Sequence, residues 1–418
     1  MANQPTPPTL LIISQVFVPD PAAVGQQIAD LAGEMVHRGW NVVVYTSARG
    51  YDDPQRRYRR HEFIDGVDVR RLPLSSFGKS SIAIRLLAGA LFLAQAIVRA
   101  LFLPRLELIL VSTSPPFAGI GGTLLSWLRA TPLVWWVMDL NPDQMVAAGK
   151  LSSSSFAVRV FEWMNRMTLS RSRDVIALDL YMKRRLVSKG PYEQKVHVVP
   201  PWPHDTILTA PKGASDSFRA RHGLGDAFVV MYSGNHAIQH PLETLLNAAR
   251  RLAERRNLVF VFVGGGAGKE GVDQQVREGA PNIVSLPFQP LDDLGESLAA
   301  ADVHVVTMGN EVVGIVHPCK VYGALAVGRP ILFFGPAESH IGDIMASHDI
   351  GVRVDHGDVG GAVAAIEKLS GLSSDTLAAI GKTAVAIVRG AFSQDHSMNK
   401  VADILCGPQS TVAEKANS

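Results

Sequence analysis

Short, continuously apolar runs recur along the chain and alternate with longer segments of helical spacing. An apolar run without polar alternation is typical of a strand buried on both faces of a parallel sheet. In the first half of the chain these runs are Thr9–Ser14, Asn41–Thr46, Leu106–Thr113, Pro132–Met138, Asp174–Leu178 and Lys195–Val199. The segment Ala22–Gly39 is amphipathic and ends in Gly, which predicts a helix.

A Pro-rich stretch, Pro200–Asp205, interrupts this alternation and is the candidate linker, because Pro breaks both helix and sheet. The alternation then restarts. Its predicted strands are Phe228–Gly234, Leu258–Gly266, Asn282–Phe288, Asp302–Met308, Pro330–Gly335 and Gly351–Val354. The tail from Asp375 to Leu405 reads as helical, and Gly407–Ser418 as frayed.

Two successive series of strands and helices predict an α/β chain of two doubly wound domains with a cleft between them. The predicted boundaries are residues 1–203 and 204–390. A C-terminal segment, 391–418, is expected to pack back on the N-terminal domain. Ligands of such sheets bind at the carboxyl ends of the strands, so the loops that follow strands are the place to look for chemistry.

Composition supports a soluble α/β protein, with 47% hydrophobic and 19% charged residues in a chain of 418. The two cysteines, Cys319 and Cys406, form neither a disulfide framework nor a metal motif, which favours a reducing compartment. The first ten residues lack a basic region ahead of an apolar stretch, so no signal peptide is expected. These features predict a cytoplasmic protein.

Charge is distributed unevenly along the chain. Residues 1–203 hold 23 Lys and Arg against 15 Asp and Glu, a difference of +8, and the remainder holds 17 against 23, a difference of −6. The basic half either faces an anionic partner or is simply a solvated surface.

The uncharged stretch Leu86–Val98 is shorter than the about 20 residues of a spanning helix, so it is a buried helix or one at a membrane interface. Basic residues at Gln55–Arg60 and Arg70–Arg71 suit an anionic leaflet, or form an exposed loop.

The clearest candidate for chemistry is Lys320. Pro318 suits a first helical position, Val321, Ala324 and Leu325 recur at helical spacing, and Gly328 supplies the stop. A Lys in the first turn of that helix meets the positive end of the helix dipole. A bound anion would explain it, since the ammonium would neutralise a diphosphate; the alternative is a solvated surface lysine.

Other strand ends offer weaker candidates. Gly264–Gly266 reads as a tight turn, because its Gly pattern alone is too common to identify a dinucleotide site. His236 and His240 share one loop, where either imidazole would hydrogen-bond a phosphate. Gly25 lies at a helix start and is either a point of close ligand approach or a simple loop Gly. Asp139 follows a strand and either orients a hydroxyl or caps the next helix.

Together these residues resemble family 4 glycosyltransferases of the GT-B fold, over about residues 9–400. The blocks that carry the likeness are PDPAAVGQQIADLAGEMVHRGWNVVVYT, STSPPF, MDLNPD, VVMYSGNHAIQHPLETLLNAA, FVFVGGG, LPFQP and GIVHPCKVYGALAVGRPIL. The last block is the most specific. It is similar to the branch that makes colanic acid, capsule and O-antigen, whose usual form is Pro-Ser-Lys-Leu-Tyr; here Cys319 replaces Ser and Val321 replaces Leu.

The resemblance implies two Rossmann-like domains and a retaining, metal-independent transfer of a hexosyl or N-acetylhexosaminyl group. The donor is a nucleotide-diphosphate sugar, with UDP favoured and GDP an alternative, and no other cofactor or nucleic acid is expected. The acceptor is a glycan, on a lipid carrier at the inner face of the membrane. Lys320 and Asp139 are the implied catalytic residues. The implied donor site comprises Lys320 with Gly25, Gly234, Asn235, His240, Gly264, Leu286, Pro287, Phe288, Glu311, Val313, Gly314, Ile315 and Val316.

The chain departs from the family pattern in the same region. The second of two family Glu residues falls at Gly323, so that carboxylate is absent, and strict spacing from Glu311 lands on Cys319. His240 stands where many members carry a Lys. Three other interpretations therefore stay open: a nucleotide-sugar 2-epimerase of the same fold, a non-catalytic sugar-nucleotide-binding scaffold and, more distantly, a nicotinamide dehydrogenase.

Overall fold

The chain forms two compact units, which the computed structural model describes for residues 7–20, 22–50, 55–75, 82–203, 207 and 213–407. Unit 1 comprises Met1–Pro200 with Asp395–Ser418, and unit 2 comprises Pro201–Gln394. The divisions fall within a few residues of the predicted ends at 203 and 390. His204 and Asp205 of the predicted linker, and residues 408–418 of the tail expected to fray, lie outside the described residues.

Unit 1 is built on an eight-stranded sheet of order β3-β4-β2-β1-β5-β6-β7-β8, parallel except for the edge pair β3 and β4. The strands are β1 (Thr9–Ile13), β2 (Asn41–Ser47), β3 (His61–Ile64), β4 (Val67–Leu72), β5 (Leu106–Val111), β6 (Leu133–Trp136), β7 (Asp174–Ala177) and β8 (Val196–Val198). The helices are α1 (Ala23–His37), α2 (Ile82–Ala100), α3 (Ala118–Arg129), α4 (Asp143–Ala147), α5 (Phe156–Arg171), α6 (Leu180–Val187) and the 3-10 turn η1 (Glu193–Lys195).

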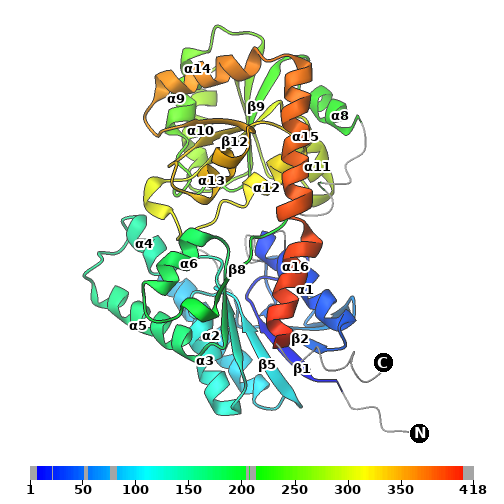
Figure 1. The fold of residues 1–418 in the computed structure, drawn as a ribbon, viewed down its shortest axis with the longest axis vertical. Coiled ribbons are helices and arrows are strands. Elements are labelled where there is room, and N and C mark those ends of the chain that lie inside the picture. Colours follow the sequence, from blue (N-terminus) through cyan, green and yellow to red (C-terminus); the bar gives the residue numbers. More distant parts are fainter. Residues whose placement is uncertain are drawn as a thin grey trace. The chain divides into compact units, whose positions relative to one another are not determined.

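The C-terminal helix α16 (Gln394–Cys406) lies beside α1 in unit 1 (Figure 1). The Arg38 guanidinium at the end of α1 donates to Asp403 at 2.6 Å and to Asn399 at 2.7 Å. Lys400 donates to the carbonyl oxygen of Val198 at 3.0 Å. Polar contacts therefore join α16 to the end of the unit's first helix and to its last strand.

Unit 2 is built on a six-stranded parallel sheet of order β11-β10-β9-β12-β13-β14. The strands are β9 (Phe228–Ser233), β10 (Leu258–Val263), β11 (Ile283–Leu286), β12 (Val303–Thr307), β13 (Ile331–Phe334) and β14 (Gly351–Val354). The helices are α8 (Ala214–Arg221), α9 (Glu243–Arg251), α10 (Lys269–Arg277), α11 (Leu294–Ala299), α12 (Lys320–Ala326), α13 (His340–Ser347), α14 (Val359–Ser370) and α15 (Ser374–Ala391), with 3-10 turns η2 (Leu291–Asp293) and η3 (Asn310–Val312).

Alternate residues of the central strand β9 supply the two faces of the unit 2 core. Val230 and Tyr232 pack into a cluster with side chains of α9 and α14. Val229 and Met231 pack on the opposite face, with Phe218 of α8. Because both faces are covered, the strands read as continuous apolar runs rather than alternating ones.

Every strand predicted from an apolar run is present, with ends that differ by three residues or fewer. Two strands were missed, β3 and β4, and the interpretation of Arg70–Arg71 as an exposed loop is wrong, because both residues lie in β4. The helical tail consists of two helices, α15 and α16, rather than one. The short helix of the Lys320 block begins at Lys320 and not at Pro318, and its stop at Gly328 has the predicted left-handed φ of +67°.

The uncharged stretch Leu86–Val98 lies within α2 and is neither wholly buried nor wholly exposed. Phe92 and Ala96 on its inner face are fully buried, whereas Leu87 and Val98 on its outer face are 56% and 57% exposed. An outer face that stays apolar without a partner in the described structure is unusual for a surface helix. The second alternative, a helix at an interface, therefore stays a prediction that this exposure favours.

By length and composition alone, one stretch of the described chain, Ser374–Cys406, would be long and apolar enough to cross a membrane. It consists of α15 and α16, and α15 packs closely on the end of α12. A Cβ at Gly381 would lie 2.3 Å from the carbonyl oxygen of Gly328. Such close backbone packing is that of a helix in a folded core, so the stretch is weak evidence for a span.

Candidate functional site

The carboxyl edge of the unit 2 sheet gathers most of the predicted donor-site residues. The chain runs from β9 outward to β10 and β11, and then returns to β12 on the other side of β9. Strand order thus reverses at β9 and β12, which is where ligands bind in open parallel sheets. Three segments meet at this edge: the loop after β9, the loop after β10 and the start of α12. All of them belong to unit 2.

Lys320 crosses from the start of α12 to the loop after β9. Its ammonium donates to the carbonyl oxygen of Asn235 at 3.1 Å and lies 5.0 Å from the centre of the Tyr232 ring. Among the described residues no carboxylate forms an ion pair with it. Burial lowers the pKa of Lys320 to about 8. Lys320 is therefore held in place without a counter-ion, and it is not the solvated surface lysine of the alternative interpretation.

Three glycines let the loops after β9 and β10 approach one another and Lys320. Gly234, Gly264 and Gly266 all have positive φ, between +123° and +132°. A Cβ at Gly234 would lie 2.6 Å from Cε of Lys320, and one at Gly264 would lie 2.1 Å from the carbonyl oxygen of Gly234. Only Gly fits such a backbone at such distances. Gly264 and Gly266 lie in bends, and the turn itself follows at Ala267 and Gly268, so the glycines predicted as a tight turn instead allow two loops to pack closely.

His240 is a neutral acceptor in this site rather than a cation. Its Nδ1 lies 2.8 Å from the carbonyl oxygen of Thr307, which can only accept, so Nδ1 carries the proton. Burial is the main reason that the pKa of His240 falls to about 3, and Lys320 lowers it further. With Nδ1 protonated and the ring neutral, Nε2 presents a lone pair. In the unliganded site His240 therefore cannot donate to a phosphate.

His236, which the sequence offered as a phosphate ligand, instead forms with Tyr232 an aromatic base next to Lys320. His236 is fully buried, and its ring meets that of Tyr232 edge-on at 4.8 Å. Its Nδ1 donates to the carbonyl oxygen of Gly234 at 3.0 Å, and burial lowers its pKa to about 4. The Tyr232 hydroxyl donates to the carbonyl oxygen of Asn235 at 2.8 Å. The two rings therefore fix the backbone of the loop after β9.

Lys269, which follows the same glycines, has a structural role. Its ammonium donates to the carbonyl oxygens of Phe262 and Leu286, both at 2.9 Å. It thereby joins the ends of β10 and β11 and fixes the backbone at Leu286. Beyond it Pro287 and Phe288 are exposed, and the Phe288 ring lies over Gly264 and Gly265, within 3.3 Å of the positions that Cβ atoms would take.

The segment from Glu311 to Val316 presents backbone more than side chain. Glu311 is exposed, whereas the side chains of Ile315 and Val316 are buried, at 2% and 6% exposure. Gly314 has a φ of +69°, and Val313 is partly buried. Of the predicted donor-site residues here, Glu311 alone has a side chain that reaches solvent freely.

The missing family carboxylate at Gly323 falls against apolar neighbours. A Cβ there would lie 3.3 Å from Cδ1 of Leu298 and 3.7 Å from Cδ1 of Ile207. The next residue toward the start of α12, Tyr322, instead makes a polar link that was not predicted. Its hydroxyl lies 2.8 Å from Nε2 of His317 and 2.9 Å from Nε2 of His340. This link joins α12 to α13.

Two predicted residues belong to unit 1. Gly25 is the third residue of α1, and a Cβ there would lie 3.1 Å from Cα of Phe17, so Gly allows α1 to pack on the loop before it. Asp139 follows β6, and its backbone N–H donates to Oγ1 of Thr113 at 3.2 Å. The N-cap position of α4, the next helix, is Pro142. Their participation in a site with Lys320, and the cleft between the two units, stay predictions.

Comparison with known proteins agrees with this architecture. Residues 22–202 match the family described as "Glycosyl transferase 4-like domain", and residues 227–371 match "Glycosyl transferases group 1". Together these two matches span most of the chain. The chain therefore belongs to the glycosyltransferases, with the GT-B arrangement of two Rossmann-like domains.

Individual relatives support the same class, and solved structures support the same fold. The chain is similar to the putative colanic acid biosynthesis glycosyl transferase WcaI of Escherichia coli, with 25% identity over 80% of this chain and 85% of that protein. It is 23% identical to the probable glycosyltransferase WbjE of Pseudomonas aeruginosa, over 71% and 73% of the two chains. Among solved structures it resembles Anabaena HepE in complex with UDP-glucose, with a TM-score of 0.68, 18% identity and coverage of 95% and 99%. The lipopolysaccharide glycosyltransferase WaaG gives a TM-score of 0.70, 16% identity and coverage of 95% and 100%.

Proposed function

We propose that this glycosyltransferase moves a hexosyl or N-acetylhexosaminyl group from a nucleotide-diphosphate sugar to a lipid-linked glycan, with retention of anomeric configuration and without a metal ion. The product belongs to a surface polysaccharide. The protein works in the cytoplasm, at the inner face of the cytoplasmic membrane. The names of the E. coli and P. aeruginosa relatives and the fold support the class of reaction.

The observation that carries the proposal is the position of Lys320. A cation without a carboxylate partner in the described structure rests beside the glycine backbone at the strand-order reversal. When the bond from sugar to diphosphate breaks, negative charge builds on the leaving phosphate. A fixed ammonium at that point stabilises the developing charge more than it stabilises the bound donor, which is the requirement for catalysis.

The remaining donor contacts follow from the shape of the same edge. The exposed ring of Phe288 offers a face on which a base can stack, and the backbone at Leu286 and Pro287 is held rigid by Lys269. UDP is favoured as the nucleotide because the Anabaena neighbour is solved with UDP and with UDP-glucose. GDP is the alternative.

His240 takes a different role from the one that the resemblance implied. Since its Nε2 presents a lone pair, it suits a hydroxyl of the donor sugar better than a phosphate oxygen. Gly234 and Asn235 then supply backbone to the diphosphate, while Glu311 and the Val313–Val316 backbone border the ribose and sugar. In unit 1, Asp139 orients the acceptor hydroxyl and Gly25 lies near the diphosphate.

Thermal unfolding in the presence of EDTA tests the donor assignment. UDP, GDP, ADP and dTDP are compared, because a ligand at 100 times its dissociation constant adds about 2.7 kcal/mol of stability. A rise in melting temperature with one nucleotide, unchanged by EDTA, supports the proposal and identifies the donor. If no nucleotide raises the melting temperature, or if EDTA abolishes the rise, the proposal of metal-free donor binding is wrong.

The apolar surroundings of Gly323 favour one second candidate, a sugar-nucleotide-binding scaffold without activity. The Cβ atom of a Glu at this position would lie against Leu298 and Ile207, which offer no polar partner to a carboxylate. Slow hydrolysis of the donor distinguishes the two. An enzyme releases sugar to water at a low rate, and a retaining one releases the anomer that the donor carried, whereas a scaffold releases none. A 2-epimerase would instead convert the donor sugar without acceptor.

A further inference from the structure

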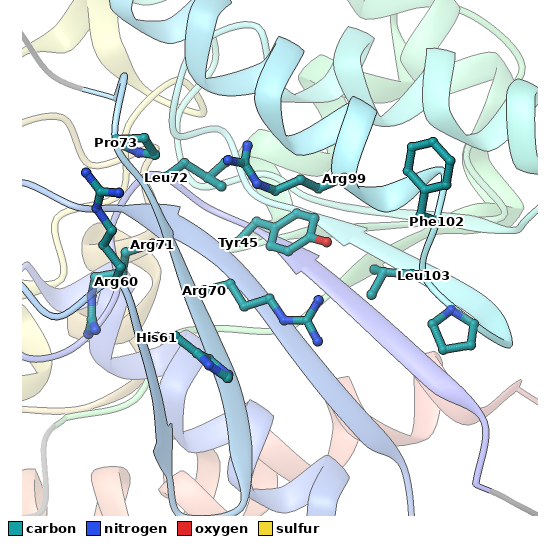
Figure 2. Close-up of a pocket in the computed structure, with 11 residues that line it drawn as sticks. Tyr45, Arg60, His61, Arg70, Arg71, Leu72, Pro73, Arg99, Phe102 and Leu103 are labelled. Carbon is teal, nitrogen blue, oxygen red and sulfur yellow. The ribbon is translucent and has the colours of Figure 1, made fainter.

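A cavity of about 550 Å³ opens on the face of the unit 1 sheet between α2 and the edge strands. Its walls come from β2, β3, β4 and the end of α2 with the turn that follows it (Figure 2). Arg60, Arg70, Arg71 and Arg99 line it together with Tyr45 and Phe102. A cavity with four guanidiniums in its wall selects an anion.

The positive charge of this cavity is only partly compensated. Arg71 is buried and pairs with Glu62, and Arg70 donates to Asp68 at 2.6 Å. Arg60 and Arg99 have no carboxylate partner among the described residues, and the contact of Arg99 is with the carbonyl oxygen of Gln95 at 3.4 Å. The cavity therefore keeps an excess of about two positive charges, before any contribution from His61.

Tyr45 adds a buried hydroxyl next to Arg70. Its side chain is fully buried, and the Arg70 guanidinium interacts with its hydroxyl. Burial raises the pKa of Tyr45, and the charges of Arg70 and Arg99 oppose that rise, so both guanidiniums lie near the phenol. In Figure 2 the hydroxyl points to the side of Leu103 and Phe102, with the Arg70 guanidinium below it, whereas the Arg99 guanidinium lies on the opposite side, near Leu72. The phenol and the two guanidiniums therefore border the cavity from different sides.

Apolar surface continues outward from the cavity. Val98, Leu101 and Phe102 are 57%, 37% and 82% exposed. Helix α3 packs against α2, and α5 packs against α3. These two helices add further exposed apolar side chains. These are Leu124, Trp127, Leu128, Phe156 and Trp163. A folded protein rarely exposes so much apolar surface without a partner.

We infer that the cavity binds the phosphate headgroup of an anionic lipid in a bilayer, with Val98, Leu101 and Phe102 inserted beside it. Arg99 and Arg70 hold the phosphate and the Tyr45 hydroxyl donates to it. The basic cavity favours an anion, and the exposed residues around it favour an apolar partner. A lipid provides both, whereas free phosphate provides only the anion. The inference deepens the membrane location in the proposed function, and it is independent of the donor chemistry of unit 2.

Two arginines of α2 provide a matched test. Arg85 and Arg99 are both exposed, and Arg99 alone lines the cavity. Binding of the full chain is measured on vesicles of phosphatidylcholine with and without phosphatidylglycerol, for the wild type, R99Q, R85Q and Y45F. If the protein is held by diffuse electrostatic attraction, R99Q and R85Q should each lose the same vesicle affinity, about fivefold. If Arg99 contacts the headgroup directly, the vesicle affinity of R99Q should be about tenfold lower than that of R85Q. This is the loss expected of a charge-assisted hydrogen bond.

The outcomes are separable. A larger loss for R99Q than for R85Q, with a loss for Y45F at unchanged melting temperature, supports the site. Equal losses for R99Q and R85Q overturn it and leave only diffuse adsorption. Displacement from the vesicles by inorganic phosphate, but not by chloride of equal ionic strength, also supports the site, because free phosphate then competes with the lipid headgroup for the cavity. If the wild type binds no vesicles, the membrane location fails as well, while UDP binding by unit 2 still tests the transferase.

Discussion

At the scale of single residues, Lys320 carries a conflict between stability and function. Its surroundings desolvate the ammonium and lower its pKa from 10.5 to about 8, and no described carboxylate offsets this. The free protein therefore carries an electrostatic cost at this position, which a bound diphosphate would remove. Such strain is characteristic of functional sites, where a charge is prepared for a ligand that is not yet present.

Removing this charge should weaken binding of the nucleotide diphosphate. Lys320→Ala is expected to cost ~1.5–3 kcal/mol of UDP binding free energy, the range for a hydrogen bond to a charged group. Titration calorimetry measures the loss. Lys382→Ala, at an exposed lysine of α15 in the same unit, is the control and should bind UDP as the wild type does. Equal affinities for Lys320→Ala and wild type would place the diphosphate elsewhere.

The same pKa predicts how stability depends on pH. Between pH 8 and pH 10.5 the unfolded chain keeps the Lys320 proton and the folded chain has lost it, so the unfolded state binds more protons. The free energy of unfolding of the wild type should therefore rise with pH in this window relative to Lys320→Met. Below pH 8 the variant should be the more stable of the two. Denaturant unfolding at pH 7 and pH 10 measures both; a difference that does not shrink with pH would contradict the lowered pKa.

As pH rises, the affinity for a nucleotide diphosphate should fall, whereas the free energy of unfolding should rise. As pH rises above about 8, free Lys320 loses its proton and its attraction for a diphosphate. His240 should not contribute to a pH profile near neutrality, because its pKa of about 3 keeps it neutral there.

Sequence reasoning located Lys320 for one physical reason, and for another it missed Tyr232 and gave His236 the wrong role. A cation in the first turn of a helix is locally unfavourable, so it stands out in the sequence. Tyr232 and His236 are locally ordinary, because Tyr suits a strand and His suits a loop. Their function is to fix the loop after β9 through contacts made only in the folded unit. The acceptor state of His240 likewise depends on the carbonyl of Thr307, 67 residues away.

At the scale of elements, the loops after β9 and β10 form one interlocked piece. The backbone of Gly264 passes so close to Gly234 that no side chain fits between them. The backbone N–H of His236 donates to Gly265 at 2.8 Å, and the N–H of Gly268 donates to His236 at 2.7 Å. Lys320 rests on this piece, so the geometry of the predicted phosphate site depends on both loops.

Gly264→Ala should therefore destabilise unit 2 and weaken UDP binding together. Backbone strain at a φ of +123° costs about 1–3 kcal/mol, and the contact with Gly234 adds to it. Gly390→Ala is the control, since no atom lies within 4 Å of its Cβ position and it sits in helix α15. That change should stabilise the protein by about 0.5–1 kcal/mol. Thermal unfolding that ranks the two variants in the reverse order would contradict this account.

The strands that sequence analysis predicted differ in their burial from the strands that it missed. Strands covered on both faces, such as β9 and β10, read as unbroken apolar runs and were predicted. The strands β3 and β4 lie at the sheet edge, where His61, Asp68 and Arg70 alternate with apolar residues. That pattern resembles a charged loop unless the neighbouring strand is known. The same edge strands line the arginine-rich cavity, so missing them concealed the cavity as well.

At the scale of the whole molecule, charge and exposed apolar surface coincide in unit 1. The excess of basic residues in the N-terminal half includes Arg56, Arg57, Arg59 and Arg60, all of which are exposed. Exposed apolar residues of α2, α3 and α5 belong to the same unit. Basic and apolar groups together favour an anionic bilayer, whereas a solvated basic face would require only the former.

Reversing this charge should release the protein from anionic membranes. Changing Arg56, Arg57, Arg59 and Arg60 to Glu is expected to abolish co-sedimentation with phosphatidylglycerol vesicles, since each basic residue near such a surface contributes about 1 kcal/mol. The matched control changes Arg250, Arg251, Arg255 and Arg256 of unit 2, also exposed, to Glu. Net charge falls equally in both variants. The control also breaks the ion pairs of Arg250 with Glu278 and of Arg255 with Glu367, so the melting temperature of each variant is measured beside its binding. If both lose binding alike, the membrane responds to net charge and unit 1 has no special part; if neither does, the basic segment of unit 1 is a solvated surface.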